Sequence, residues 1–170
     1  MSGWLNERSR NGGLDEVPLP SQTGRMWLCG KHLVGPDPEA ALKRTGASTI
    51  VCLNPIGELA SRYPDYVDWL RAYNGESAMW VPVHDMHALA LEDFSAVVEA
   101  VRARLDDGRG VIIHCGAGIG RAGTLASAVL VSLGMSVDGA LAHLRAHRPM
   151  AGPQTREQEL ALAEYAQSLR

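Results

Sequence analysis

The sequence has no long hydrophobic run and contains only two lysines. No apolar stretch approaches the roughly 20 residues that a membrane-spanning helix needs, and the first residues lack the basic and then apolar pattern of a secretion signal. Lysine occurs only at Lys31 and Lys43, and the net charge is −3, so bulk charge favours neither a nucleic acid nor a membrane surface as a partner. These absences predict a cytoplasmic protein by default.

Cysteine is also scarce, and its number is odd. Cys29, Cys52 and Cys115 are too few for a disulfide framework, which agrees with a reducing compartment. We interpret Cys29 and Cys52 as small core residues because both lie in apolar segments with strand character. Cys115 lies among glycines and therefore needs a different explanation.

The length of 170 residues predicts one domain that is large enough to bury a core. Residues 1–24 are rich in Gly, Asn, Ser, Arg and Pro, which predicts an irregular N-terminal arm with Trp4, Leu5 and Leu14 as candidate anchors. Residues 25–170 form the predicted globular domain.

Strand-like and helix-like segments alternate along this domain. We expect strands at 26–29, 48–53, 78–83 and 111–113, and helices at 38–46, 58–62, 64–73, 91–107, 120–134, 137–147 and after residue 155. This alternation predicts an α/β fold, a single domain whose central sheet is mostly parallel, or mixed, and is flanked by helices. Ligands of such sheets bind beyond the carboxyl ends of the strands.

The segment 111–124, VIIHCGAGIGRAGT, joins a predicted buried strand to a glycine-rich loop and then to a helix. Glycines let successive backbone amides curl around an anion, and the N-terminus of the helix adds a positive dipole. The predicted phosphate-binding residues are Gly116, Ala117, Gly118, Ile119, Gly120 and Arg121. The loop amides and Arg121 favour the thiolate of Cys115, and the planar guanidinium suits two phosphate oxygens.

Two other anion-binding motifs fit less well. Residues 118–123 match the Gly-x-Gly-x-x-Gly dinucleotide fingerprint, but the sequence after residue 134 predicts a helix where that fold needs a strand with an acidic residue. A nucleotide-binding P-loop would need Gly-Lys-Ser/Thr, which is absent. Neither motif explains Cys115 together with Arg121.

The combination of His114 and Cys115, a five-residue spacer, Arg121 and Gly123 resembles the signature loop of the cysteine-dependent protein tyrosine phosphatases. The similarity is greatest to the compact, atypical dual-specificity phosphatases. It implies that the thiolate attacks phosphorus and forms a phosphocysteine intermediate, with no metal or organic cofactor. It also implies that His114 hydrogen-bonds the loop backbone.

The resemblance further implies a general acid on a loop, and Asp85 is the matching residue. Asp85 follows the predicted strand 78–83 and lies 30 residues before Cys115. The leaving oxygen needs a proton, which a carboxylic acid can supply before it activates water. A loop aspartate by itself would more often form a turn. Asp93 is the second choice. It falls in the first turn of a predicted helix, where carboxylates commonly serve to start the helix.

Gln154 and Gln158 match a glutamine-bearing loop that positions the hydrolytic water in this family. Thr155 followed by Gln158 also fits a simple helix capping box, and both interpretations stay open. We interpret the histidine pairs, 84 with 87 and 143 with 147, as surface residues rather than metal ligands, because no glutamate accompanies the second pair.

Ala122 departs from the family pattern, which usually has Ser or Thr after the arginine to help the sulfur leave. Thr124 is expected to bond a carbonyl one turn back and not to replace that hydroxyl. The sequence therefore predicts a phosphate-monoester hydrolase acting on phosphorylated protein or peptide, with phosphotyrosine as the first choice. The alternatives are a phosphoprotein-binding relative with impaired turnover and, with less support, a rhodanese-like sulfurtransferase.

Overall fold

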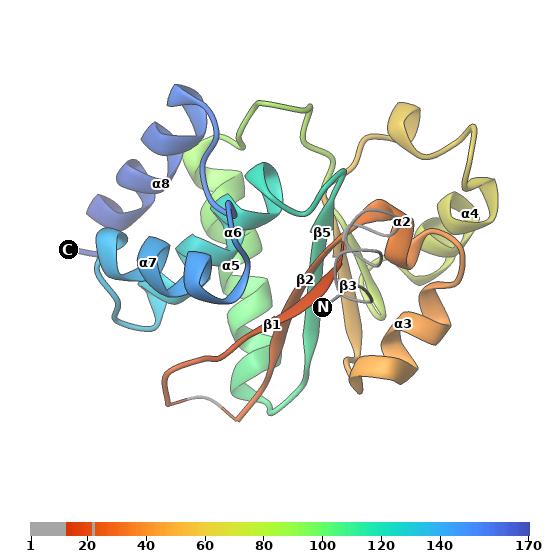
Figure 1. Cartoon of the computed structure of the whole chain (residues 1–170), viewed down its shortest axis with the longest axis horizontal. Helices are drawn as coiled ribbons and strands as arrows, with labels where there is room; N and C mark the ends of the chain where they lie inside the picture. The colour runs from red at the N-terminus through yellow and green to blue at the C-terminus, as the bar shows by residue number, and fades with distance from the viewer. Residues whose placement is uncertain (1–12, 22) are drawn as a thin grey trace.

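Five strands form one mixed sheet at the centre of the computed structural model, which describes residues 13–21 and 23–170 (Figure 1). The strand order across the sheet is β1 (Leu14–Val17), β2 (Met26–Gly30), β5 (Val111–Cys115), β3 (Thr49–Cys52) and β4 (Ala78–Trp80). β1 is antiparallel to β2, and all other pairs are parallel. The predicted α/β class and mixed sheet are confirmed.

β5 lies in the middle of the sheet and is buried along its whole length. In the parallel pairing, Cys115 lies beside Gly30 of β2, and His114 lies beside Cys52 of β3. Parallel strands end at the same edge, so the loops that follow β2, β3 and β4 all approach the loop that follows Cys115. The buried central strand predicted before the glycine-rich loop is confirmed.

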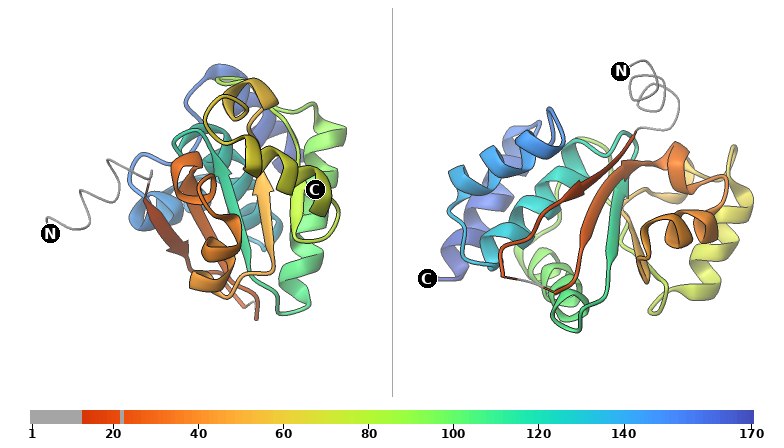
Figure 2. Two further views of the ribbon diagram at one scale, coloured as in Figure 1. Left: turned by 90° about the vertical axis from the view of Figure 1, so that its right-hand side faces the viewer. Right: turned by 60° about the horizontal axis from the view of Figure 1, so that its bottom comes forward.

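Helices cover both faces of the sheet (Figures 1 and 2). One face carries α2 (Lys31–Val34), α3 (Pro38–Thr45) and α4 (Pro64–Tyr73), and the other carries α5 (Leu91–Asp106), α6 (Gly120–Ser132), α7 (Val137–His147) and α8 (Arg156–Ser168). Ile112 packs in the core under α2–α4, whereas its neighbour Ile113 packs in the core under α5–α8. This alternation along β5 is the pattern of a strand covered on both sides.

Two helices begin as the sequence predicts. The Asp37 carboxylate accepts a hydrogen bond from the Ala40 amide (3.0 Å) at the start of α3, and Gly46 ends that helix with φ of 74°. The Thr155 hydroxyl accepts a bond from the Gln158 amide (3.3 Å) at the start of α8. No helix within residues 13–21 and 23–170 has both the length and the apolar character needed to cross a membrane.

The structure corrects three predicted segments. Leu14–Val17, in the arm predicted to be irregular, forms β1, because its backbone pairs with β2, a contact that local composition does not reveal. Trp4 and Leu5 lie outside the described residues. β4 ends at Trp80 and not at residue 83, although the Val81 and Val83 amides still donate to the Cys52 and Leu53 carbonyls at 2.9 Å each. The predicted helix at 58–62 is replaced by a single 3₁₀ turn, η1 (Ile56–Glu58).

Candidate active site

The glycine-rich loop between β5 and α6 forms the floor of a pocket of about 550 Å³. The loop is attached to the start of α2, where the Lys31 backbone amide donates to the Gly116 carbonyl at 3.0 Å. Gly118 has φ of 73°, and a Cβ there would lie 2.3 Å from the Cys29 carbonyl oxygen, so only glycine fits. The pocket is lined by loop residues Cys115, Gly116, Ala117, Ile119, Gly120 and Arg121, together with Asp85, Met86, Glu58, Gln154, Lys31 and His32.

Arg148, at the end of α7, holds the loop from the side opposite to the pocket. Its side chain is fully buried, and it donates from Nε to the Gly118 carbonyl (2.7 Å) and from Nη2 to the Ala117 carbonyl (2.9 Å). Its Nη1 donates to Asp15 of β1 at 2.9 Å. Because these carbonyls point towards Arg148, the loop presents its amides and not its oxygens to the pocket.

Cys115 and Arg121 meet at the bottom of this pocket. Cys115 is almost fully buried, and its Sγ accepts a bond from the Ala122 amide at 3.5 Å. Arg121 donates from both terminal nitrogens to the Glu58 carboxylate, at 2.9 Å each, and from Nη1 to the Val83 carbonyl at 2.7 Å. Its buried Nε has no hydrogen-bond partner among the described residues. A donor is therefore left over for an oxyanion.

The guanidinium of Arg121 stays charged in this environment. Burial alone would lower its pKa, but the bond to Glu58 and the nearby Cys115 and Asp85 raise the pKa above its ordinary value. Burial raises the pKa of Glu58, but the hydrogen bond and charge of Arg121, together with Asn54 and Lys31, bring it below its ordinary value. The pair therefore remains ionised at neutral pH.

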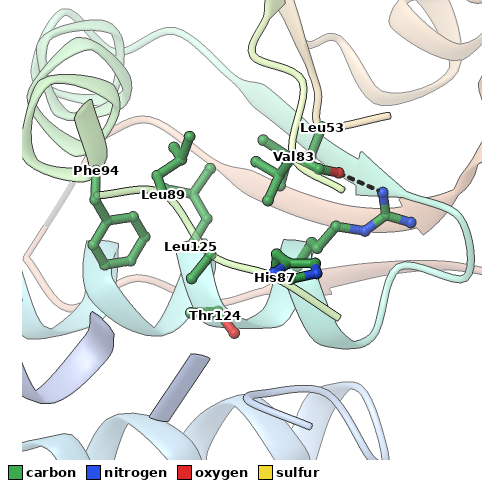
Figure 3. A pocket seen from close by; sticks show the side chains of 9 residues that line it. Leu53, Val83, His87, Leu89, Phe94, Thr124 and Leu125 are labelled. Carbon is green, nitrogen blue, oxygen red and sulfur yellow. Dashed lines mark hydrogen bonds between the residues drawn. The ribbon is translucent and has the colours of Figure 1, made fainter. Parts of the chain in front are cut away.

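The wall beside Arg121 is largely apolar (Figure 3). Leu53, Val83, Leu89, Phe94 and Leu125 line a small cavity there, together with His87, Ala88 and Thr124. Electrostatic interactions are stronger beside such a low-dielectric wall than in open solvent. The wall thus strengthens the attraction between the guanidinium and any bound anion.

Asp85 lies at the pocket rim, as its position after β4 predicts. Its side chain is 65% exposed, and its carboxylate lies 3.5 Å from Arg121 Nη2 and accepts a bond from the Met86 amide. The loop that carries it is attached to the start of α8, where Thr155 donates to the Met86 carbonyl (2.9 Å). Asp93 instead lies in the first turn of α5 and does not line the pocket.

The two glutamines occupy different places. Gln154 lines the pocket, and a Cβ on Gly120 would lie 2.4 Å from its Oε1, so its amide lies against the start of α6. Gln158 is buried. Its side-chain Oε1 accepts a bond from the backbone N–H of Gln154 (2.8 Å), and its Nε2 donates to the His87 carbonyl (3.2 Å). Gln158 therefore joins α8 to the Asp85 loop and does not line the pocket, whereas Gln154 does.

His114 is fully buried behind Cys115. Its Nδ1 lies 3.2 Å from the Cys115 carbonyl oxygen, which can only accept, so Nδ1 carries the proton. Its Nε2 must then accept from the Tyr66 hydroxyl at 2.7 Å. Burial lowers the pKa of His114 to about 4, so the ring is neutral at physiological pH. His114 thus contacts the loop backbone, as the resemblance implied.

This shifted pKa predicts that stability falls in weak acid. Between pH 6.5 and 4, His114 binds a proton in the unfolded chain but stays neutral in the folded chain. The free energy of unfolding should therefore decrease as the pH falls through this window, with His114 contributing up to about 1.4 kcal/mol per pH unit. Urea unfolding of His114→Gln should show a shallower pH dependence than the parent. His84→Gln, at an exposed histidine, should keep the parent's slope, and equal slopes in all three proteins would contradict the prediction.

The sequence predicted that Cys115, Arg121 and Asp85 belong to one site, and all three line the same pocket. It did not predict three residues that surround them. Glu58 follows the carboxyl end of β3, and that position was an available signal for a residue near the site. Tyr66 and Arg148 carry no such signal, because both lie in amphipathic helical segments or at their ends.

The described part of the chain contains no group of three or more His, Cys, Asp or Glu side chains that could hold a metal ion. His143 contacts the Pro18 carbonyl (2.7 Å), and His147 contacts the His143 carbonyl (2.8 Å). One ring nitrogen of each histidine in this second pair therefore already contacts a backbone oxygen.

The chain matches one family model and is similar in structure to several phosphatases. The family model "Swiss Army Knife protein, DSP-PTPase phosphatase domain" matches residues 31–165. Tk-PTP in its active form is similar, with 24% identity over 89% of this chain and 96% of that one and a TM-score of 0.70. Kinase associated phosphatase has 26% identity over 85% and 87%, with a TM-score of 0.70. Human DUSP28 has 22% identity over 92% and 94%, with a TM-score of 0.67. A search of curated proteins gave no match.

Proposed function

The chain belongs to the Swiss Army Knife family of DSP-PTPase phosphatase domains, and we propose that Cys115, Arg121 and Asp85 carry its chemistry. It is a protein tyrosine or dual-specificity phosphatase, a cysteine-based phosphoric monoester hydrolase. Neither a sulfurtransferase nor a binding-only relative is favoured by the family match. The observation that carries the residue assignment is the meeting of Cys115 Sγ, the Arg121 guanidinium and the Asp85 carboxylate in one pocket.

In the first half of the proposed reaction, the Cys115 thiolate attacks phosphorus. The S–P bond forms as the bond from phosphorus to the leaving oxygen breaks, and Asp85 gives its proton to that oxygen. The amides of residues 116–121 and the unpaired Nε of Arg121 bind the equatorial oxygens. Glu58 holds the arginine by two hydrogen bonds, so the guanidinium needs little reorganisation when substrate arrives.

In the second half, water replaces the sulfur. Asp85, now a carboxylate, removes a proton from water as the new P–O bond forms and the S–P bond breaks, which regenerates the thiolate. Gln154 lines the same pocket and is our choice for the residue that positions this water. Gln158 is excluded from that role because both ends of its amide are already bonded to the chain.

We propose a phosphorylated protein or peptide as the substrate, with phosphotyrosine first, and a cytoplasmic site of action. The spacer of the loop contains no lysine, and the Lys31 ammonium group already donates to the Glu58 carbonyl (3.0 Å). The pocket thus offers few cations for the additional phosphates of a phosphoinositide.

The function is tested by hydrolysis of para-nitrophenyl phosphate by the purified protein in the presence of EDTA. We expect turnover that EDTA leaves unchanged and, after rapid acid quenching, an added phosphoryl mass on the peptide that contains Cys115. Turnover without a labelled Cys115 would overturn the residue assignment. Transfer of sulfur to cyanide without phosphatase activity would instead support the sulfurtransferase.

Ala122 predicts slow hydrolysis of the intermediate. Its methyl group is fully buried, its amide lies 3.5 Å from Cys115 Sγ, and Thr124 cannot help because its hydroxyl donates to the Gly120 carbonyl (2.7 Å). Ala122→Ser should supply a hydroxyl to the leaving sulfur and raise the steady-state rate about tenfold, the effect of one hydrogen bond to a charged group.

Stopped-flow measurements of para-nitrophenol release test this prediction. The parent should give a burst followed by a slow steady state, and Ala122→Ser should reduce the contrast between the two phases. Thr124→Val serves as the matched control and should leave the burst amplitude unchanged. A lost burst with an unchanged steady-state rate in Ala122→Ser would contradict the explanation.

A further inference from the structure

A second concave surface lies beside the catalytic pocket, on the other side of the Asp85 loop. Its volume is about 370 Å³, and its apolar floor comes from Ala88, Leu89 and Ala90 of the loop and from Leu160 and Ala161 of α8. Leu160 is 46% exposed, which leaves a large apolar side chain in contact with solvent. We call this surface the α8 groove.

The α8 groove is acidic. Glu157 and Glu164, seven residues apart and thus on one side of α8, complete its lining, and none of its lining residues, all within the described part of the chain, is basic. Glu157 already accepts bonds from the His87 ring and the Ala88 amide, at 2.9 Å each. Glu164 has no hydrogen bond or ion pair with any described residue. One carboxylate is therefore available to a partner.

The groove and the catalytic pocket are separated by one short stretch of chain. Asp85 and Met86 line the pocket, and Ala88, Leu89 and Ala90 line the groove. Each residue spans at most about 3.6 Å, so Ala88 lies within about 11 Å of Asp85 and Ala90 within about 18 Å. An extended peptide held by its phosphate in the pocket therefore reaches the groove within three to five residues.

The charges of the two sites are opposite. The catalytic pocket presents Arg121 and the loop amides to an anion, whereas the groove presents Glu164 beside an apolar floor. A ligand that fits both carries a phosphate at one point, and a basic side chain beside an apolar one a few residues away.

We propose that the α8 groove binds the segment flanking the phosphorylated residue of a peptide substrate, and that it selects an arginine or lysine next to an apolar residue three to five positions away. This proposal rests on the phosphatase activity proposed above and adds a sequence preference to it. Glu164 provides the charge recognition, and Leu160 provides the apolar contact.

The test compares phosphotyrosine peptides in which an Arg-Leu pair is moved through each position within five residues of the phosphotyrosine. A matched series carries Glu-Leu at the same places. We expect kcat/KM to be about fivefold higher for Arg-Leu than for Glu-Leu at one or more positions three to five residues away, the size of an exposed ion pair. Glu164→Lys should remove or reverse this preference without changing the hydrolysis of para-nitrophenyl phosphate.

Glu159→Lys is the matched control, because it makes the same charge change on α8 at a residue that does not line the groove. It should keep the preference of the parent. Equal kcat/KM for the two peptide series in the parent, or an unchanged preference in Glu164→Lys, would overturn the proposal while leaving para-nitrophenyl phosphate turnover intact. Loss of that turnover in the parent would instead count against the phosphatase activity.

Peptide binding to Cys115→Ser, measured by fluorescence anisotropy, makes the same comparison without turnover. Leu160→Asp should weaken binding of the Arg-Leu peptide about tenfold, as expected when a leucine contact is lost. If Leu160→Asp converts a dimer to a monomer in sedimentation and leaves peptide binding unchanged, the groove is an interface between two copies of this chain and the peptide proposal is wrong.

Discussion

Cys115→Ser is expected to lower kcat for para-nitrophenyl phosphate by at least about 10⁴-fold, the effect of losing a covalent nucleophile. A serine hydroxyl keeps the shape of the side chain but stays protonated at neutral pH, so the attacking anion is missing. The loop amides and Arg121 are unchanged, and we therefore expect the variant to bind phosphate or a phosphopeptide as the parent does. Steady-state kinetics and phosphopeptide binding measure the two effects separately.

Cys52→Ala is the matched control for this experiment. Cys52 lies on β3 in the core under α2–α4, and burial raises the pKa of its thiol to about 12, so it is not a nucleophile at neutral pH. Its removal should leave kcat within about threefold of the parent, since only core packing changes. Activity that survives Cys115→Ser would remove Cys115 from the mechanism, and activity that disappears in Cys52→Ala while the fold is intact would contradict the purely structural role of Cys52.

Arg148→Met should cost about 3–5 kcal/mol of unfolding free energy, the usual result when one partner of a buried ion pair is removed. The carbonyls of Ala117 and Gly118 would lose their donors, and the carboxylate of Asp15, whose side chain is only 14% exposed, would lose its ion pair with Arg148. The loop should also lose the restraint that turns its amides towards the pocket, so kcat should fall together with stability. Urea denaturation and para-nitrophenyl phosphate kinetics measure the two losses.

Arg145→Met gives the comparison for that variant. Arg145 lies one turn earlier on α7, is exposed and donates from Nε to the Ala151 carbonyl at 3.2 Å, so its removal should cost only about 1 kcal/mol. The double variant Asp15→Asn with Arg148→Met should be less unstable than the sum of its single changes, because the two side chains contact each other directly. Equal costs for the two arginine variants would mean that the loop does not depend on Arg148.

Local sequence was sufficient to predict elements whose signals lie within a few residues. The helix at 38–46, the capping box of Thr155 and Gln158 and the loop from Cys115 to Arg121 depend on local spacing alone. The position of Asp85 near Cys115 followed from one further rule, that parallel strands end at the same edge. β1 was missed because a four-residue edge strand has too few positions to show alternation and is stabilised by its partner.

The sequence by itself determined the reactive unit of this protein: a cysteine and an arginine around a glycine-rich turn between a strand and a helix, because that unit is local in the chain. Only the tertiary structure decided what surrounds it. Glu58 holds Arg121 across 63 positions of sequence, and Arg148 reaches the loop from 30 positions away. Such contacts depend on how distant segments pack, and no local pattern encodes their geometry, so they became visible only when the helices were placed on the sheet.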